Sequence, residues 1–183
     1  MNDTAPWNEC LRFWFEETSP KQRFAKDPEF DALIRERFGE LHAHAVAGDL
    51  ADWRNTPEGR LAEIIILDQF SRNMYRGTPA AFAQDDMALT LAQEAVRVGA
   101  DKALTPQQRV FLYMPYMHSE SESVQEKSVA LFEALGIEDN LRFAKAHKEI
   151  IDHFGRFPHR NEILGRPSRP DELAFLDTPG SSF

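Results

Sequence analysis

The sequence predicts an all-α protein built from antiparallel helical hairpins, and three observations support this prediction. Apolar residues recur at helical spacing along most of the 183-residue chain. Proline and polar residues that start helices alternate with glycines that end them. No window shows the sustained alternation of polar and β-branched residues that marks a strand. The connections between segments are short, so consecutive helices are expected to lie antiparallel.

The helix boundaries are marked by N-caps and glycines. Asp27-Pro28 and Thr56-Pro57 each combine an N-cap with proline at the first helical position. Residues 105–108, Thr-Pro-Gln-Gln, form a capping box. The helix that follows this box contains Pro115, which should kink it or end it early. The expected helices cover approximately residues 6–15, 28–47, 57–74, 85–98, 106–117, 124–135 and 141–154.

Small residues indicate how some of these helices pack. Ala88, Ala92 and Ala95 share one helical face, and Gly99 is followed by a new helix. This pattern is typical of one unit of a helix-turn-helix solenoid. An irregular helical bundle remains the alternative, because the repeat is not exact.

Length and composition indicate one domain over residues 1–183, with an arginine-rich loop at about 155–170 and a short C-terminal tail. Cys10 is the single cysteine, which excludes an internal disulfide and a cysteine-based zinc site. The first residues lack a basic segment followed by an apolar one, so we expect a cytoplasmic protein rather than a secreted one.

The net charge of −9 argues against two classes of partner. Nucleic acid and anionic membranes both require a basic protein face. The longest apolar run, residues 111–117, is too short to span a bilayer. We therefore expect neither a nucleic-acid nor a membrane partner.

One predicted helix contains polar residues in apolar surroundings. Ile64 to Leu67 point in all directions around the helix axis, which is typical of a central helix. Asp68 and Arg72 follow at i,i+4 spacing, and buried polar groups of this kind need partners. Asp68–Arg72 could be a structural ion pair, or the polar row could line a ligand cavity. The row consists of Asp68, Gln69, Arg72, Asn73 and Arg76.

A second group of polar residues lies at 155–161, Gly-Arg-Phe-Pro-His-Arg-Asn. The segment follows a helix C-terminus, so its arginines could simply complement the helix dipole. Arginine also suits carboxylate or phosphate recognition, and the proline and aromatic residues stiffen the loop. The candidate ligand-binding residues here are Arg156, Arg160 and Asn161.

The histidines supply the candidate acid–base groups. His118 and His159 are the favoured candidates, assisted by Asp68 or Glu120. His147 shares a face with apolar residues and is expected to be a satisfied core residue. His118, Glu120, His147 and His159 could in principle assemble a metal site, but no pair has the spacing of a zinc motif, and no metal is predicted. His42 and His44 are expected to face solvent.

Three motifs resemble those of a known family. They are residues 67–78, 111–120 and 155–161, followed by Leu-Gly-Arg at 164–166. Together they resemble bacterial domain-of-unknown-function family 924, whose first motif commonly has proline at the position of Ser71. The resemblance implies a fold similar to the tetratricopeptide-repeat-like superfamily, with a right-handed arrangement of helical hairpins, and it implies no reaction or cofactor.

Together these observations predict one polar pocket for a small anionic ligand, between the central helix (68–76) and the 155–161 loop. Arg72, Arg156 and Arg160 would supply charge, while amides would give direction. The alternative is a scaffold that binds a partner peptide through exposed aromatic side chains. The aromatic residues considered for that role are Trp53, Tyr75 and Phe82. The cofactor and the oligomeric state are left unassigned.

Overall fold

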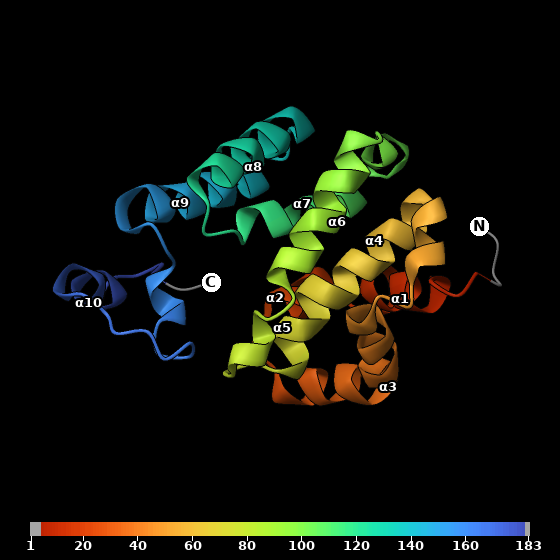
Figure 1. The fold of residues 1–183 in the computed structure, drawn as a ribbon, viewed down its shortest axis with the longest axis horizontal. Helices are drawn as coiled ribbons and strands as arrows, with labels where there is room; N and C mark the ends of the chain where they lie inside the picture. Colours follow the sequence, from red (N-terminus) through yellow and green to blue (C-terminus); the bar gives the residue numbers. More distant parts are fainter. Residues whose placement is uncertain (1–4, 182–183) are drawn as a thin grey trace. The chain divides into compact units, whose positions relative to one another are not determined.

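The computed structural model describes residues 5–181 and divides the chain into two compact units. The first contains the chain up to Arg76 together with residues 80–115, and the second contains residues 77–79 and the chain from Tyr116 onward. The described residues form helices and no strands, which confirms the predicted all-α class (Figure 1). The single-domain and tetratricopeptide-like assignments stay predictions.

Helices α1 to α7 account for most of the first unit (Figure 1). Their bounds are α1 Asn8–Arg12, α2 Pro20–Phe24, α3 Pro28–Ala47, α4 Pro57–Ile65, α5 Ser71–Met74, α6 Asp85–Arg97 and α7 Pro106–Met117. Two π-helical segments, Phe13–Glu17 and Ile66–Phe70, continue α1 and α4. Short 3-10 turns occupy Ala51–Asn55, Pro79–Ala81 and Ala100–Ala103.

The predicted start and stop signals are confirmed. The carboxylate of Asp27 accepts hydrogen bonds from two backbone N–H groups at the start of α3. The hydroxyl of Thr56 accepts the N–H of Gly59 at 3.0 Å. Thr105 and Gln108 exchange hydrogen bonds as a capping box. Gly48 ends α3 with φ of 82°, a conformation in which a side chain would be strained.

The central helix of the first unit is the predicted 57–74 helix, formed by α4, the π-helical segment and α5. Ile64, Ile65, Ile66 and Leu67 are fully buried, as expected for a helix that is apolar all round. The π-helical segment contains Asp68 and Gln69, and such segments often occur at functional sites. The apolar pattern of the sequence predicts a continuous helix here and gives no sign of this interruption.

Aromatic side chains pack around the central helix. The Phe70 ring lies 5.6 Å from Trp14 and 4.9 Å from Phe38, measured between ring centroids. Trp14 also contacts Phe111 of α7 at 5.5 Å. Helix α7 continues through Pro115 and ends two residues later, at Met117.

Two predicted exposures are wrong. His42 is buried, because its Nε2 shares a hydrogen bond with the hydroxyl of Ser71 at 2.8 Å and its ring packs on Tyr75. Trp53 is also buried. Tyr75 is 37% exposed and Phe82 is half-buried, so only part of the predicted aromatic surface is accessible.

The second unit consists mainly of the α8–α9 hairpin and the short helix α10 (Figure 1). Helix α8 spans Glu122–Leu135, α9 spans Glu138–Phe154, and α10 spans Pro170–Leu176. A 3-10 turn, Pro158–Arg160, lies in the predicted arginine-rich loop. Among the described residues, no helix combines the length and apolar character needed to cross a membrane.

Candidate functional site

Arg72 of the central helix is bound by two carboxylates of the first unit. Its guanidinium nitrogens donate to the carboxylate oxygens of Asp85 at 2.8 and 2.9 Å. The predicted i,i+4 pair with Asp68 is present, with nitrogen and oxygen 3.0 Å apart. Burial opposes the charge of Arg72, but the two aspartates outweigh it and raise the pKa of its guanidinium.

Arg76 and Asn73 are satisfied by a carboxylate from α3. Arg76 donates two hydrogen bonds to Asp31, at 2.6 and 2.8 Å, and the amide of Asn73 donates to the same group at 2.8 Å. The amide nitrogen of Gln69 donates to Asp68 at 2.6 Å. These contacts support the structural interpretation of the polar row, in which carboxylates of the protein itself hold its cations and amides.

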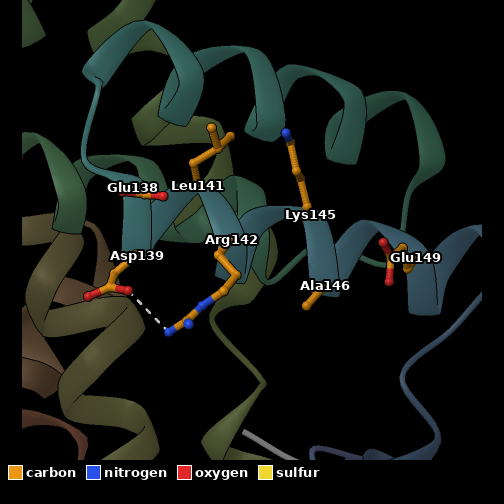
Figure 2. Close-up of a pocket in the computed structure, with 7 residues that line it drawn as sticks. All are labelled: Glu138, Asp139, Leu141, Arg142, Lys145, Ala146 and Glu149. Carbon is orange, nitrogen blue, oxygen red and sulfur yellow. Dashed lines mark ion pairs between the residues drawn. The ribbon is translucent and has the colours of Figure 1, made fainter.

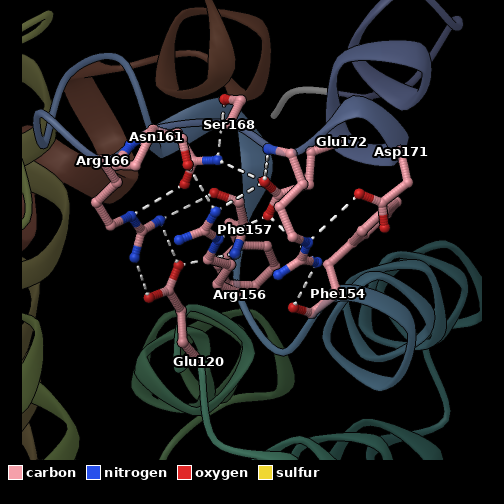
Figure 3. A network of polar contacts seen from close by, with 11 residues as sticks. Glu120, Phe154, Arg156, Phe157, Asn161, Arg166, Ser168, Asp171 and Glu172 are labelled. Carbon is pink, nitrogen blue, oxygen red and sulfur yellow. Dashed lines mark hydrogen bonds and ion pairs between the residues drawn. The ribbon is translucent and has the colours of Figure 1, made fainter.

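In the second unit, Glu172 binds two of the predicted ligand-binding residues (Figure 3). Its buried carboxylate accepts two hydrogen bonds from Arg156, at 2.6 and 2.7 Å, and one from the Asn161 amide at 3.2 Å. The hydrogen bonds from Arg156 are the main reason that the pKa of Glu172 falls to about 2. Arg156 and Asn161 therefore fasten the loop to α10.

Glu120 also holds this loop in place, through Phe157 and Arg166 (Figure 3). Its carboxylate accepts two hydrogen bonds from Arg166, at 2.7 and 3.0 Å, and one from the backbone N–H of Phe157 at 2.7 Å. Burial would raise the pKa of Glu120, but Arg166 and this N–H group outweigh it and lower the pKa. Glu120 is therefore ionised and already bound to Arg166 and the Phe157 N–H group, which argues against a role as general base.

In the second unit, two histidines and an arginine lie around Phe157, and a third histidine lies beside one of them. The ring of buried Phe157 lies 5.6 Å from the His147 ring and 5.6 Å from the His159 ring. The guanidinium carbon of Arg160 lies 4.7 Å from the same ring centroid. The His118 and His147 rings are 6.3 Å apart. We call His118, His147, His159 and Arg160 the histidine–arginine cluster.

The four side chains of the histidine–arginine cluster are buried to different extents. His147 and Arg160 are buried, with 5% and 7% of their surface exposed, whereas His118 and His159 are half-buried. Arg160 donates a hydrogen bond to the backbone carbonyl of His118 at 2.9 Å. This contact fixes the guanidinium beside the turn that carries the His118 ring.

His147 is held in its neutral form. Its Nδ1 lies 2.8 Å from the carbonyl of Phe143, so Nδ1 carries the proton and Nε2 is left as the acceptor. Burial is the main reason that the pKa of His147 falls to about 3, and the charges of His118, His159 and Arg160 lower it further. The predicted core position of His147 is confirmed, whereas its position near the other two histidines was not predicted.

The predicted site residues thus form two sets that lie in different units. His118, Glu120, Arg156, His159, Arg160 and Asn161 belong to the second unit, and Asp68, Gln69, Arg72, Asn73 and Arg76 belong to the first. The prediction of one pocket shared by both sets stays a prediction. Within the described part of the chain, no group of three or more histidine, cysteine or acidic side chains is placed to hold a metal ion.

A separate hollow of about 520 Å³ lies along α9 (Figure 2). Charged side chains of both signs line it, and two of them, Asp139 and Arg142, form an exposed ion pair at 3.1 Å. Such a mixed and solvated surface selects neither an anion nor a cation. The histidine–arginine cluster is therefore the better candidate site.

The fold and the cluster together define an all-helical protein with a partly buried group of three histidines and an arginine. Residues 10–180 match the family model described as bacterial protein of unknown function, DUF924, and the chain belongs to that family. It is also similar to a solved structure, the protein of unknown function ATU0120 from Agrobacterium tumefaciens. The two chains are 38% identical with a TM-score of 0.90, over 96% of this chain and 99% of the other. No curated protein matches the chain.

Proposed function

We propose that the protein binds a small anionic ligand at the histidine–arginine cluster of its second unit. The observation that supports this proposal is the gathering of His147, His159 and Arg160 around Phe157, with His118 beside His147. These side chains bring several hydrogen-bond donors together, one of them the permanently charged guanidinium of Arg160. Arginine and protonated histidine are also the side chains that donate charge-assisted hydrogen bonds to carboxylates and phosphates.

The nearby carboxylates are already engaged, which strengthens the proposal. Glu120 binds Arg166 and the Phe157 N–H group, and Glu172 binds Arg156. These pairs hold Arg156 and Arg166, whereas Arg160 donates to the backbone carbonyl of His118. The central helix shows the opposite balance, because its arginines are bound by Asp31, Asp68 and Asp85.

We also propose that His118 and His159 transfer protons to or from the bound ligand. His118 and His159 are half-buried, so each ring combines access to solvent with a place beside the proposed ligand. An imidazole can act as acid or base near neutral pH. Of the four acid–base candidates, these two are retained, because Glu120 and Asp68 both hold arginines.

The binding proposal can be tested by thermal unfolding in inorganic phosphate at pH 6, against sodium chloride of equal ionic strength. With a dissociation constant near 1 mM, 10 mM phosphate should raise the unfolding midpoint by about 3–6 °C. The double variant His118→Gln/His159→Gln should lose this rise. The matched control, His44→Gln/His153→Gln, changes two exposed histidines and should keep it. A rise that survives in the first variant, or no rise in the unaltered protein, would contradict the proposal.

A peptide-binding scaffold remains the second interpretation, and no specific contact favours it. Trp53 is buried and Phe82 is half-buried, and the Tyr75 ring packs against His42. The proposal of an anionic ligand is therefore preferred.

A further inference from the structure

Arg166 makes hydrogen bonds in several directions within the arginine-rich loop (Figure 3). Its guanidinium donates to both carboxylate oxygens of Glu120, at 2.7 and 3.0 Å. The same group donates to the backbone carbonyl of Phe157 at 3.1 Å and to the side-chain oxygen of Asn161 at 3.0 Å. Arginine suits this role because its planar fork presents several donors in fixed directions.

Phe157 is held at both of its backbone polar groups. Its N–H donates to Glu120 at 2.7 Å, and its carbonyl accepts from Arg166 at 3.1 Å. Glu120 and Arg166 also bind each other, so the two contacts on Phe157 form one connected unit. The position of this backbone, and with it that of the buried ring, therefore depends on the Glu120–Arg166 pair.

The Phe157 ring is the surface against which part of the histidine–arginine cluster packs. Its centroid lies 5.6 Å from the ring centroids of His147 and His159. It lies 4.7 Å from the guanidinium carbon of Arg160. A shift of the Phe157 backbone would therefore move the support that these three side chains share.

Glu120 also joins the two segments that carry the half-buried histidines. It follows His118 by two residues, and the Phe157 N–H group that it accepts precedes His159 by two. Arg160 links the same segments, because it donates to the carbonyl of His118 at 2.9 Å. These two contacts set the separation of His118 from the segment 157–160.

We infer that Arg166 is a positioning residue of the site, acting through Glu120 and Phe157 on the arrangement of the histidine–arginine cluster. This inference rests on the proposed binding function. Donors recognise a ligand well only when their neighbours hold them close to the productive geometry. Arg166 performs this role without touching the ligand.

The test replaces Arg166 by lysine and measures phosphate binding to the full chain by isothermal titration calorimetry at pH 6. Lysine keeps the positive charge but lacks the fork that binds Glu120 and Phe157 together. Arg166→Lys should therefore weaken phosphate binding by about tenfold, as expected for the loss of a supporting contact around a binding site.

Arg169→Lys is the matched control in the same loop. Arg169 is about half exposed, and it contacts Asp171, Glu172 and the carbonyl of Phe154. The control loses comparable ion pairs without changing the hold on Phe157, so its phosphate affinity should change by less than about twofold.

NMR of the histidine rings without phosphate gives a second readout that needs no ligand. In Arg166→Lys, the ring signals of His147 and His159 should shift, because the aromatic ring beside them moves. In Arg169→Lys, the same signals should stay in place. A loss of stability alone, without movement of the site, would leave these signals unchanged.

Glu120→Gln provides a milder variant that tests the same pair if Arg166→Lys does not fold. Glutamine keeps an oxygen for the Phe157 N–H group but loses the charge that binds Arg166. This variant should weaken phosphate binding by about threefold and shift the same ring signals.

Unchanged affinity together with unchanged ring signals would overturn the inference, while phosphate binding by the unaltered protein would still support the proposed function. Weaker binding without a shift would show that Arg166 acts on the ligand directly, and a shift without weaker binding would show that the arrangement does not matter for binding. Either result would also overturn the inference. If the unaltered protein does not bind phosphate, the proposed function fails, and the ring signals alone decide whether Arg166 positions the cluster.

Discussion

The polar row of the central helix and the histidine–arginine cluster both contain buried arginine and other polar residues. The arginines in the two regions have different partners. In the first unit, Arg72 and Arg76 each contact at least one aspartate. In the second unit, Arg160 donates to a neutral carbonyl and lies among three imidazoles. The first arrangement pairs its arginines with carboxylates, and the second places its arginine beside imidazoles and a backbone carbonyl.

This difference shows how a structural network and a binding site can be distinguished when both contain arginine. A network built for stability brings its own counter-ions, as Asp31 and Asp85 do here. A site for an anion keeps cations together and holds them through backbone groups, as Arg160 is held by the carbonyl of His118. The variants below test this distinction through stability.

The largest effect is expected for Asp31→Ala. This change removes the carboxylate that binds Arg76 and Asn73, and it should lower the free energy of unfolding by about 3 kcal/mol. Urea unfolding measures the loss. The double variant Asp31→Ala/Arg76→Met also removes the charge of Arg76, which has lost its partner. This variant should recover part of the lost free energy of unfolding. A loss below about 1 kcal/mol would show that the network is not structural.

The next effect concerns the pH dependence of stability. The pKa of His147 is about 3 in the folded protein, against the ordinary value of 6.5 in the unfolded chain. Because the folded value is depressed, the unfolded chain binds the proton first, so stability present above pH 6.5 is lost as the pH falls toward 3. The loss at pH 5 should be about 2 kcal/mol. His147→Gln should flatten the dependence between pH 6.5 and 5, and an unchanged slope would contradict the burial of a neutral imidazole.

A smaller effect is expected for His159→Gln. The side chain is half-buried and belongs to a group of like charges, so its loss should change the free energy of unfolding by less than about 1 kcal/mol. Urea unfolding without phosphate provides the measurement. A loss comparable with that of Asp31→Ala would make the histidine–arginine cluster a structural network like the polar row.

The smallest effect is expected for Arg97→Gln, which removes an exposed ion pair with Glu94 on α6. Water and salt screen such a pair, so thermal unfolding should show no detectable change. A measurable loss would mean that exposed pairs contribute to this fold, and the contrast between buried and exposed charges would be weaker than we infer.

Local signals in the sequence predicted the fold well, and contacts between distant residues account for what was missed. The caps at Asp27 and Thr56 and the stop at Gly48 depend on neighbours within a few positions. The pairing of Arg76 with Asp31 joins residues 45 positions apart, and that of Arg166 with Glu120 joins residues 46 apart. One sequence contains no signal for either pair.

The same reasoning explains the site. The density of polar residues in their motifs marked His118, His159 and Arg160 as candidates. The structure places His159 and Arg160 beside Phe157, and His118 beside His147. Arg166 was not among these candidates, because its contact with Glu120 joins distant residues. The wrong exposure of His42 has the same origin.

The central claim is that the positive charge of the second unit binds an anion, and a phosphate titration followed by NMR of the histidine rings tests it most directly. The chain has six histidines. We predict saturable shifts for the rings of His118, His147 and His159, with His42, His44 and His153 unchanged. Equal shifts at all six rings, or none at the first three, would contradict the account.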